Sequence, residues 1–248
     1  MNVPHDNRTY LPFAPNVRLS SDAMLCFAEV AKAARFVVKE GGSQKIDLRG
    51  LPTSERACLE HILGKGEVSI RIDGASTIDA RESIFAGVWL LKGDAVDMLE
   101  VATVPELALS CAFKARRPCQ GNTTPRIEGL TCAPALFTEM LDKSFTITPE
   151  QEPYIVNLTN LPHTATDLQW LDQALGTGSV TALSYGYGNC YISATATYRI
   201  WRVQFFNSTG TLILDTFQAT EIPELILATL EDIADSANRI ETTLKAIT

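Results

Sequence analysis

The sequence of 248 residues lacks a long hydrophobic run, and this absence argues against a membrane-spanning helix. Its longest apolar or small-residue stretch runs from about Ile84 to Leu91, whereas a bilayer needs about 18 such residues. Residues 1–17 are polar and carry three prolines, without the basic and then apolar segments of a secretory signal. We therefore expect a protein that works in the cytoplasm.

Basic residues are scarce, above all in the last part of the chain. The net charge is −8, and residues 151–248 contain 4 Lys and Arg against 10 Asp and Glu. Nucleic-acid binding normally needs a basic face that neutralises phosphates, so this composition argues against a nucleic-acid partner. An acidic second part would instead attract a cationic partner.

Residue types that form catalytic or metal sites are few and scattered. The chain has three histidines, and none of its six cysteines forms a CxxC pair. We find no HExxH, GxSxG or P-loop motif. In a cytoplasmic chain, such cysteines are more often free buried thiols than disulfides. We therefore predict no catalytic residue and no resident cofactor.

The most informative feature that is present is an internal repeat. Residues 46–70 and 156–182 share an apolar-x-Leu strand, Leu-Pro, a short helix and Leu-Gly-x-Gly-x-Val. The match continues through Trp89 and Trp201 to Pro-Glu-Leu at residues 105–107 and 223–225. Leu-Pro favours the end of a strand, and runs of Ile, Val and aromatic residues favour strands. We predict an α+β fold of two β-α-β-β-β-α repeats with mainly antiparallel sheets.

An additional helix precedes the first repeat, with a cap at Ser21 or Asp22 and a stop at Gly41-Gly42. The predicted boundaries are residues 1–112 for this helix and the first repeat, and 154–248 for the second repeat. Residues 113–153 are rich in Pro, Thr, Gly and Cys and contain one helical candidate. We interpret them as a linker or covering segment.

A long final helix is predicted from Pro223 to about Ile247. Its apolar residues, from Ile226 onward, are spaced alternately four and three residues apart, which is heptad spacing. Two interpretations stay open. The helix packs on the sheet of its own repeat, or it pairs with a partner or with a second copy of the chain in a homodimer.

One loop of the second repeat, residues 184–190, has a sequence unlike that of the matching residues 72–78 of the first. Its glycines allow a close approach of the backbone, which fits either a tight hairpin turn or a recognition loop. The candidate partner-binding residues of this loop are Tyr185, Gly186, Tyr187, Gly188, Asn189 and Cys190. Trp170, one position from the apolar stripe of its helix, either packs in the core or is half exposed and serves as a further binding anchor.

The cysteines leave two chemical alternatives open. Thiolates bind iron and iron–sulfur clusters, so Cys190 with one or more of Cys111, Cys119 and Cys132 could form a carrier site. Cys190 by itself could be the nucleophile of a thiol enzyme, which would require a nearby base.

Five motifs between about Leu158 and Ile240 point to a family. They are Leu175-Gly-x-Gly-x-Val180, Gly186-Tyr-Gly-Asn-Cys190, Trp201 with Phe205-Phe206-Asn207-Ser208, Ile222-Pro-Glu224 and Glu231-Asp-Ile-Ala-Asp-Ser236. Together they resemble the C-terminal region of the HupH/HyaF/HoxQ family of hydrogenase expression proteins. Tyr185 departs from the pattern, because arginine is expected there in this family.

The resemblance implies an accessory protein in the maturation of uptake nickel–iron hydrogenase. It implies a chaperone role toward the small, iron–sulfur subunit before twin-arginine export, beside a thioredoxin-like companion. Our leading hypothesis is therefore a cytoplasmic binding protein that holds the immature small subunit through the second repeat. The iron or iron–sulfur carrier is the alternative.

Overall fold

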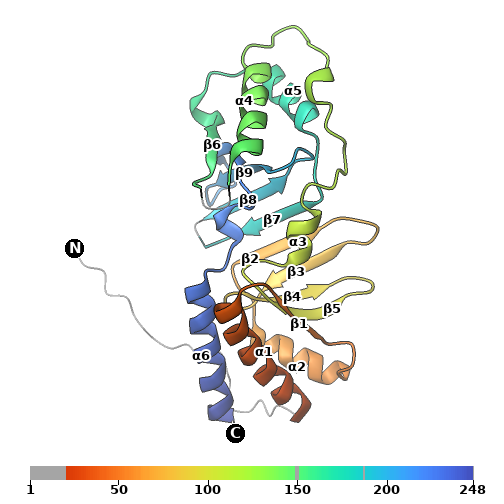
Figure 1. The fold of residues 1–248 in the computed structure, drawn as a ribbon, viewed down its shortest axis with the longest axis vertical. Coiled ribbons are helices and arrows are strands. Elements are labelled where there is room, and N and C mark those ends of the chain that lie inside the picture. Colours follow the sequence, from red (N-terminus) through yellow and green to blue (C-terminus); the bar gives the residue numbers. More distant parts are fainter. Residues whose placement is uncertain (1–20, 149–150, 187, 248) are drawn as a thin grey trace, which may run out of the picture.

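The computed structural model describes residues 21–148, 151–186 and 188–247. Within these residues, six α-helices surround one antiparallel sheet of ten strands (Figure 1). This architecture and the helix before the first strand confirm the predicted α+β class. No helix in the described part is both long and apolar enough to cross a bilayer.

The chain divides into two halves of similar order. The first half contains α1 (Ser21–Glu40), β1 (Gln44–Asp47), α2 (Thr53–Leu63), β2 (Val68–Ile72), β3 (Ile78–Glu82), β4 (Val88–Lys92), β5 (Asp97–Val101) and α3 (Glu106–Cys111). The second contains η1 (Gly121–Thr123), α4 (Ala133–Thr146), β6 (Tyr154–Asn157), η2 (Leu158–Asn160), α5 (Ala165–Leu175), β7 (Val180–Ser184), β8 (Asn189–Ala194), β9 (Ile200–Phe206), β10 (Leu212–Ala219), η3 (Glu224–Ile226) and α6 (Leu230–Ile247).

The two halves share one sheet, whose strand order is β1-β5-β4-β3-β2-β7-β8-β9-β10-β6. β2 and β7 pair at the junction, where Ile70 lies opposite Ala182. Outward from this junction, β2-β3-β4-β5-β1 corresponds to β7-β8-β9-β10-β6. The topology of one half therefore matches that of the other strand by strand.

Four strands follow α2 in the first half and α5 in the second, so the predicted number of three strands after this helix is wrong. The long apolar stretches that contain Trp89 and Trp201 each fold as two strands joined by a turn. In each turn a hydroxyl bonds a carbonyl two residues on, from Ser83 to Phe85 and from Thr195 to Thr197. A backbone with positive φ follows in both, at Gly87 and at Arg199. These polar turn bonds are easy to overlook in a sequence of strand-forming residues.

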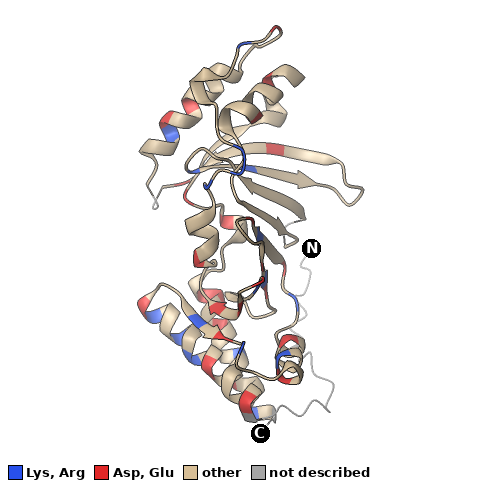
Figure 2. Cartoon of the chain, turned by 90° about the vertical axis from the view of Figure 1, so that its right-hand side faces the viewer, with Lys and Arg blue, Asp and Glu red and all other residues tan. Residues whose placement is uncertain are grey.

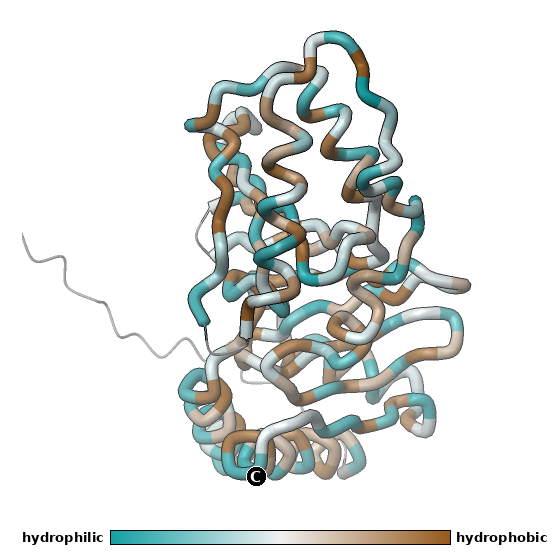
Figure 3. The backbone as a smooth tube through the Cα atoms, turned by 45° about the horizontal axis from the view of Figure 1, so that its top comes forward, coloured by the Kyte–Doolittle hydropathy of each residue, from teal (hydrophilic) through white to brown (hydrophobic). Residues whose placement is uncertain are grey.

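Helices cover one sheet face only at its two ends, and the short helix α3 packs on the opposite face (Figure 1). α1, α2 and α6 pack on the first half, and α4 and α5 pack on the second. The opposite face carries a continuous core to which both halves contribute, with Trp89 and Trp201 completely buried in it. Hydrophobic and hydrophilic residues alternate along the helices, which agrees with one buried face for each (Figure 3).

The segment between the halves is more than a linker. Its helix α4 packs on α5 and the second sheet half, with Phe137 and Met140 buried there. α4 precedes the first strand of its half as α1 precedes β1. Each half therefore has a helix before its first strand, α1 before β1 and α4 before β6. The sequence alone predicts a linker or covering segment for the residues of α4.

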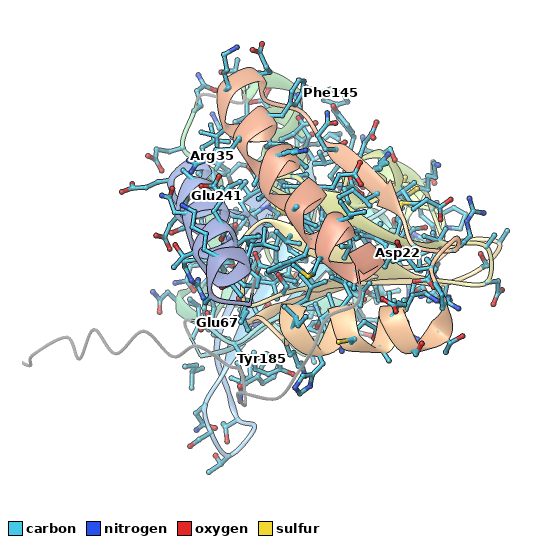
Figure 4. The ribbon with its side chains drawn as sticks, turned by 90° about the horizontal axis from the view of Figure 1, so that it is seen from below. Asp22, Arg35, Glu67, Phe145, Tyr185 and Glu241 are labelled. Atoms are coloured by element: carbon cyan, nitrogen blue, oxygen red, sulfur yellow. The ribbon has the colours of Figure 1, made fainter. Side chains whose placement is uncertain are left out.

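The final helix begins at Leu230, not at Pro223, because a short 3-10 turn and an extended stretch come first. Neither sequence interpretation of its packing is correct. The apolar residues Ile233, Ala237 and Ile240 are completely buried against α1 and the sheet of the first half. Arg35 of α1 also pairs with Glu241 at 3.1 Å, and both are labelled in Figure 4. The heptad face is thus used within the chain, which removes the basis for the homodimer.

Candidate functional site

The distinctive loop of the second half lies at the junction of the halves, between β7 and β8. Tyr185, Gly186, Gly188 and Asn189 are exposed, and Gly186 bridges to Gly188. Gly188 has φ +100° with open space around its Cα, so this loop needs a residue that tolerates a left-handed backbone. Tyr187 lies outside the described residues. The loop is therefore a hairpin turn whose exposed groups face solvent.

Cys190 does not share this exposure. Its side chain is 2% exposed, points into the shared core, and burial raises the pKa of its thiol to about 11. A thiolate nucleophile needs a lowered pKa and a nearby base, and this environment supplies the opposite. Cys190 is therefore a residue of β8 that packs in the core.

The cysteines proposed as alternative iron ligands lie on different elements. Cys111 ends α3, Cys119 is exposed in the following segment, and Cys132 precedes α4. Within the described ranges, no three His, Cys, Asp or Glu side chains are arranged to hold a metal ion. The geometry does not favour the carrier alternative.

The half-exposed alternative for Trp170 is wrong. This side chain is 3% exposed and packs edge-to-face on Phe137, with ring centroids 6.0 Å apart. Its indole N–H donates to the carbonyl of Pro125 at 3.1 Å. The helix α4, whose position the sequence did not reveal, covers the face on which Trp170 lies. Trp170 is therefore part of the second half's core, away from the loop.

A groove of about 1170 Å³ opens on one side of the loop, and we call it the acidic groove. Four carboxylates line it, those of Glu67, Glu82, Glu224 and Asp232, with Lys65 as the basic side chain among the lining residues. Gly186 also lines it, and a Cβ at that position would lie 2.1 Å from the Glu67 carboxylate. Figure 4 shows Glu67 and Tyr185 close together. The groove would attract a cationic group.

Glu82 is the buried member of this set. It is 9% exposed, and its Oε1 accepts a hydrogen bond from the N–H of Gly87 at 3.1 Å. Burial raises the pKa of Glu82, the bond from Gly87 opposes that rise, and the charges of Glu67 and Asp232 add to it. A positive charge placed in the groove would favour the ionised form of Glu82.

A second hollow, of about 680 Å³, lies on the part of the helix-bearing sheet face that no helix covers, and we call it the central face. Leu183 and Tyr191 lie opposite one another on β7 and β8, and with Tyr185 they are the exposed apolar groups there. Arg71 and Asp79 form an exposed ion pair beside them at 3.4 Å. Exposed aromatic side chains among charged neighbours are typical of protein-binding surfaces.

Sequence reasoning located the loop but missed most of what surrounds it. Glu67 and Glu82 belong to the first half and meet the loop only because β2 pairs with β7. Leu183 and Tyr191 alternate with buried Ala182 and Cys190, so both faces of these strands are partly apolar. That pattern was a usable signal, but it is equally typical of a strand buried on both faces.

Comparison with known proteins identifies the family. Residues 21–114 and 130–247 match the family described as HupH hydrogenase expression protein, C-terminal conserved region. The chain is 46% identical over 250 residues to Hydrogenase expression/formation protein HupH of Rhodobacter capsulatus, covering all of this chain and 90% of that protein. It is 32% identical over 202 residues to Hydrogenase-1 operon protein HyaF of Escherichia coli (strain K12), covering 79% and 70%.

A solved structure of hydrogenase expression protein HupH from Thiobacillus denitrificans is also similar, at 26% identity and a TM-score of 0.40. It covers 46% of this chain and 92% of its own. On the match of the family and its curated relatives, this chain belongs to the HupH hydrogenase expression protein family. The two matched segments contain all the α-helices and strands of the two halves described above.

Proposed function

We propose that this protein acts in hydrogenase maturation by binding the immature small subunit of the enzyme, and not by catalysis. The observation that carries the proposal is the position of the loop between two hollows. Tyr185 lines the central face, and Gly186 lines the acidic groove. A partner that engages the loop would contact both hollows at once, and this gives a larger and more specific surface than either hollow alone.

Family membership supports the choice of hydrogenase as the system. Relatives with 32–46% identity are named as hydrogenase expression, formation or operon proteins. The choice of the small-subunit precursor rests on the family resemblance, as does a thioredoxin-like companion working beside this protein. The charge of −8 and the four carboxylates of the acidic groove are compatible with a precursor that presents a basic segment.

The test changes the shape of the loop without touching the core. Gly188→Val forces a β-branched residue into a left-handed backbone at the exposed loop. Gly210→Val is its matched control, because Gly210 also has positive φ and open space but lies in the β9–β10 turn. Asn189→Ala removes an exposed polar group of the loop.

We expect Gly188→Val and Asn189→Ala to lower hydrogenase activity in cells that carry the operon and to reduce co-purification of the small-subunit precursor. Gly210→Val should leave both readouts at the wild-type level. Circular dichroism must show all three variants folded. Normal activity and precursor recovery in both loop variants would refute the proposal.

A further inference from the structure

The acidic groove has a counterpart in the second half, because the halves correspond residue by residue around the junction. Two pairs of backbone hydrogen bonds show this, each pair having one member in each half. In the first pair, Gly66 N–H donates to Glu82 O and Gly178 N–H donates to Ala194 O. In the second pair, Tyr185 N–H donates to Glu67 O and Asp73 N–H donates to Ser179 O. Glu67 therefore corresponds to Ser179, Lys65 to Thr177, and Tyr185 to Asp73.

In the second half, the chain itself fills the corresponding place. Residues 112–117, with the sequence Ala-Phe-Lys-Ala-Arg-Arg, lie beside Thr177 and Ser179, just before β7. The bonds are Ser179 N–H to Ala112 O at 2.9 Å, Thr177 N–H to Arg117 O at 2.8 Å, Arg116 N–H to Thr177 O at 2.9 Å and Ser179 Oγ–H to Lys114 O at 2.7 Å. The segment consists of turns and bends with a single bridge from Arg117 to Thr177, and it is basic and held mainly through its backbone.

The same backbone groups are unpaired in the first half. Among the described residues, no hydrogen bond engages the N–H or carbonyl of Lys65 or the N–H of Glu67. In the second half, the chain beyond α3 supplies the partners. In the first half, the chain beyond η3 turns away, because Ala228 bonds to Thr103 and α6 starts at Leu230. Free backbone donors and acceptors at an open site can pair with the backbone of an added segment.

The side chains that differ between the two places favour a positively charged occupant. Glu67 occupies the position of Ser179, whose hydroxyl donates a hydrogen bond to the carbonyl of Lys114. An ionised carboxylate can only accept hydrogen bonds, so Glu67 would bind a donor group of the occupant. Glu82 replaces Ala194, is nine-tenths buried and lines the groove, and its second carboxylate oxygen has no partner among the described residues. In the filled place Arg116 pairs with Asp73 at 2.5 Å. Tyr185 stands at the position that corresponds to Asp73, and it lines the central face.

We propose that the acidic groove binds a basic segment of a partner protein, paired with the backbone of residues 65–67 and with a Lys or Arg side chain between Glu67 and Glu82. The filled place in the second half is the structural template for this complex. The inference rests on the proposed function in one respect, since the segment would belong to the hydrogenase precursor.

The first experiment uses the filled place as the source of its probe. A capped synthetic peptide, Ala-Phe-Lys-Ala-Arg-Arg, and a twin in which Lys and Arg are replaced by neutral norleucine and citrulline are titrated into the full-length protein. The proteins are the wild type, Glu67→Lys, Glu67→Gln with Glu82→Gln, and a control with the exposed carboxyls of Asp94 and Glu128 changed to Asn and Gln. All are checked for folding by circular dichroism.

We expect the basic peptide to bind the wild type and the control equally, and both groove variants at least about tenfold more weakly. Raising the salt concentration should weaken binding, and the neutral twin should bind no better than the groove variants do. Equal binding of the twin would show that the groove accepts apolar segments and would overturn the basic occupant. Equal binding to Glu67→Lys would overturn the site.

A second readout separates this inference from the proposed function. The tagged wild type and Glu67→Lys are used to recover the small-subunit precursor, with and without excess basic peptide. Loss of recovery in the variant and displacement by the peptide support both claims. Recovery unaffected by either would overturn the groove as the precursor's site and leave the proposed function standing. Peptide binding without any precursor recovery would refute the proposed function and keep the groove as a basic-peptide site.

Discussion

The two halves of this protein share a sheet topology and differ in what covers it. Around Trp89 and Trp201 they are nearly identical, down to the turn hydroxyls and the positive-φ residues. At the helix layer they diverge. α4 and α5 cover the second half, whereas α1, α2 and a helix contributed by the other half cover the first. Matched strands thus do not require matched partners.

The crossing helix explains why one groove is filled and the other is open. After α3 the chain lies beside Thr177 and Ser179 of the second half, but after η3 it leaves the corresponding place in the first half to begin α6. Figure 2 shows many of the Lys, Arg, Asp and Glu residues on the helices at the lower end of the molecule. The same departure of the chain therefore ties the halves together and leaves the acidic groove unoccupied.

The largest expected effect concerns the shared core. The indole N–H of Trp89 donates to Ala102 O at 3.0 Å and that of Trp201 to Glu221 O at 3.3 Å, and both side chains are completely buried. We expect Trp89→Ala and Trp201→Ala each to lower the free energy of unfolding by about 3–5 kcal/mol. Because both halves contribute to one core, urea unfolding should remain a single transition.

Unfolding is followed by far-ultraviolet circular dichroism, with Trp→Phe at each position in case an alanine variant does not fold. Two transitions, of which each variant moves only one, would show that the halves are separate cooperative units.

A smaller effect is expected from Asp167, which joins the two helices α4 and α5 of the second half. It caps α5 together with Thr164 and accepts hydrogen bonds from the N–H groups of Thr131 and Ala133 at the start of α4. Asp167→Ala leaves these donors without an acceptor. We expect a loss of about 2–3 kcal/mol in the free energy of unfolding, measured in urea at neutral pH.

The pH dependence gives an independent check. Burial acts to raise the pKa of Asp167, but the bonds from the Thr131 hydroxyl and from the N–H groups of Thr164, Thr131 and Ala133 outweigh it and hold that pKa below its ordinary value. The ionised group therefore stabilises the fold above the unfolded-state pKa of about 3.9, and this contribution is lost as the pH falls below that value. The stability difference between wild type and Asp167→Asn should shrink as the pH falls from 6 to about 2. A constant difference would contradict this.

The next prediction compares the turn between β3 and β4, which contains Gly87, with the equivalent turn between β8 and β9, which contains Arg199. Gly87 has φ +76°, and a Cβ there would lie 2.4 Å from Cγ1 of Ile233 on the crossing helix. Arg199, at the corresponding position, has space for a side chain that pairs with Glu221. We expect Gly87→Ala to cost about 2 kcal/mol in the free energy of unfolding, through overpacking and backbone strain.

A double-mutant cycle separates these two causes. Ile233→Ala removes the clashing atoms, so Gly87→Ala should cost less in that background than in the wild type. Purely additive costs would show that α6 does not press on this turn.

The smallest effect on stability and the clearest effect on function are expected at the exposed surface. Tyr185→Ala with Tyr191→Ala should change the free energy of unfolding by no more than about 0.5 kcal/mol. Hydrogenase activity in cells carrying the operon should nevertheless fall. Ala75→Ser, in the equivalent loop of the first half, is the control and should change neither quantity.

The sequence by itself determined the strand-forming segments, the Leu-Pro and glycine boundaries, the helix before β1, and the family motifs. These depend on local backbone preferences and on periodicity, which a single chain displays without any partner. It also located the loop at Tyr185–Asn189, because a mismatch between otherwise similar segments is visible in one dimension.

Only the tertiary structure decided what those segments meet. The apolar spacing of α6 defines a face to be buried, but it does not say whether the sheet of its own half, a second copy or the other half buries it. Trp170 is covered by α4, and Cys190 faces the core because its parity on β8 puts it there. Glu67 and Glu82 reach the loop of the other half only through the pairing of β2 with β7, since contacts between distant strands depend on register and layer order.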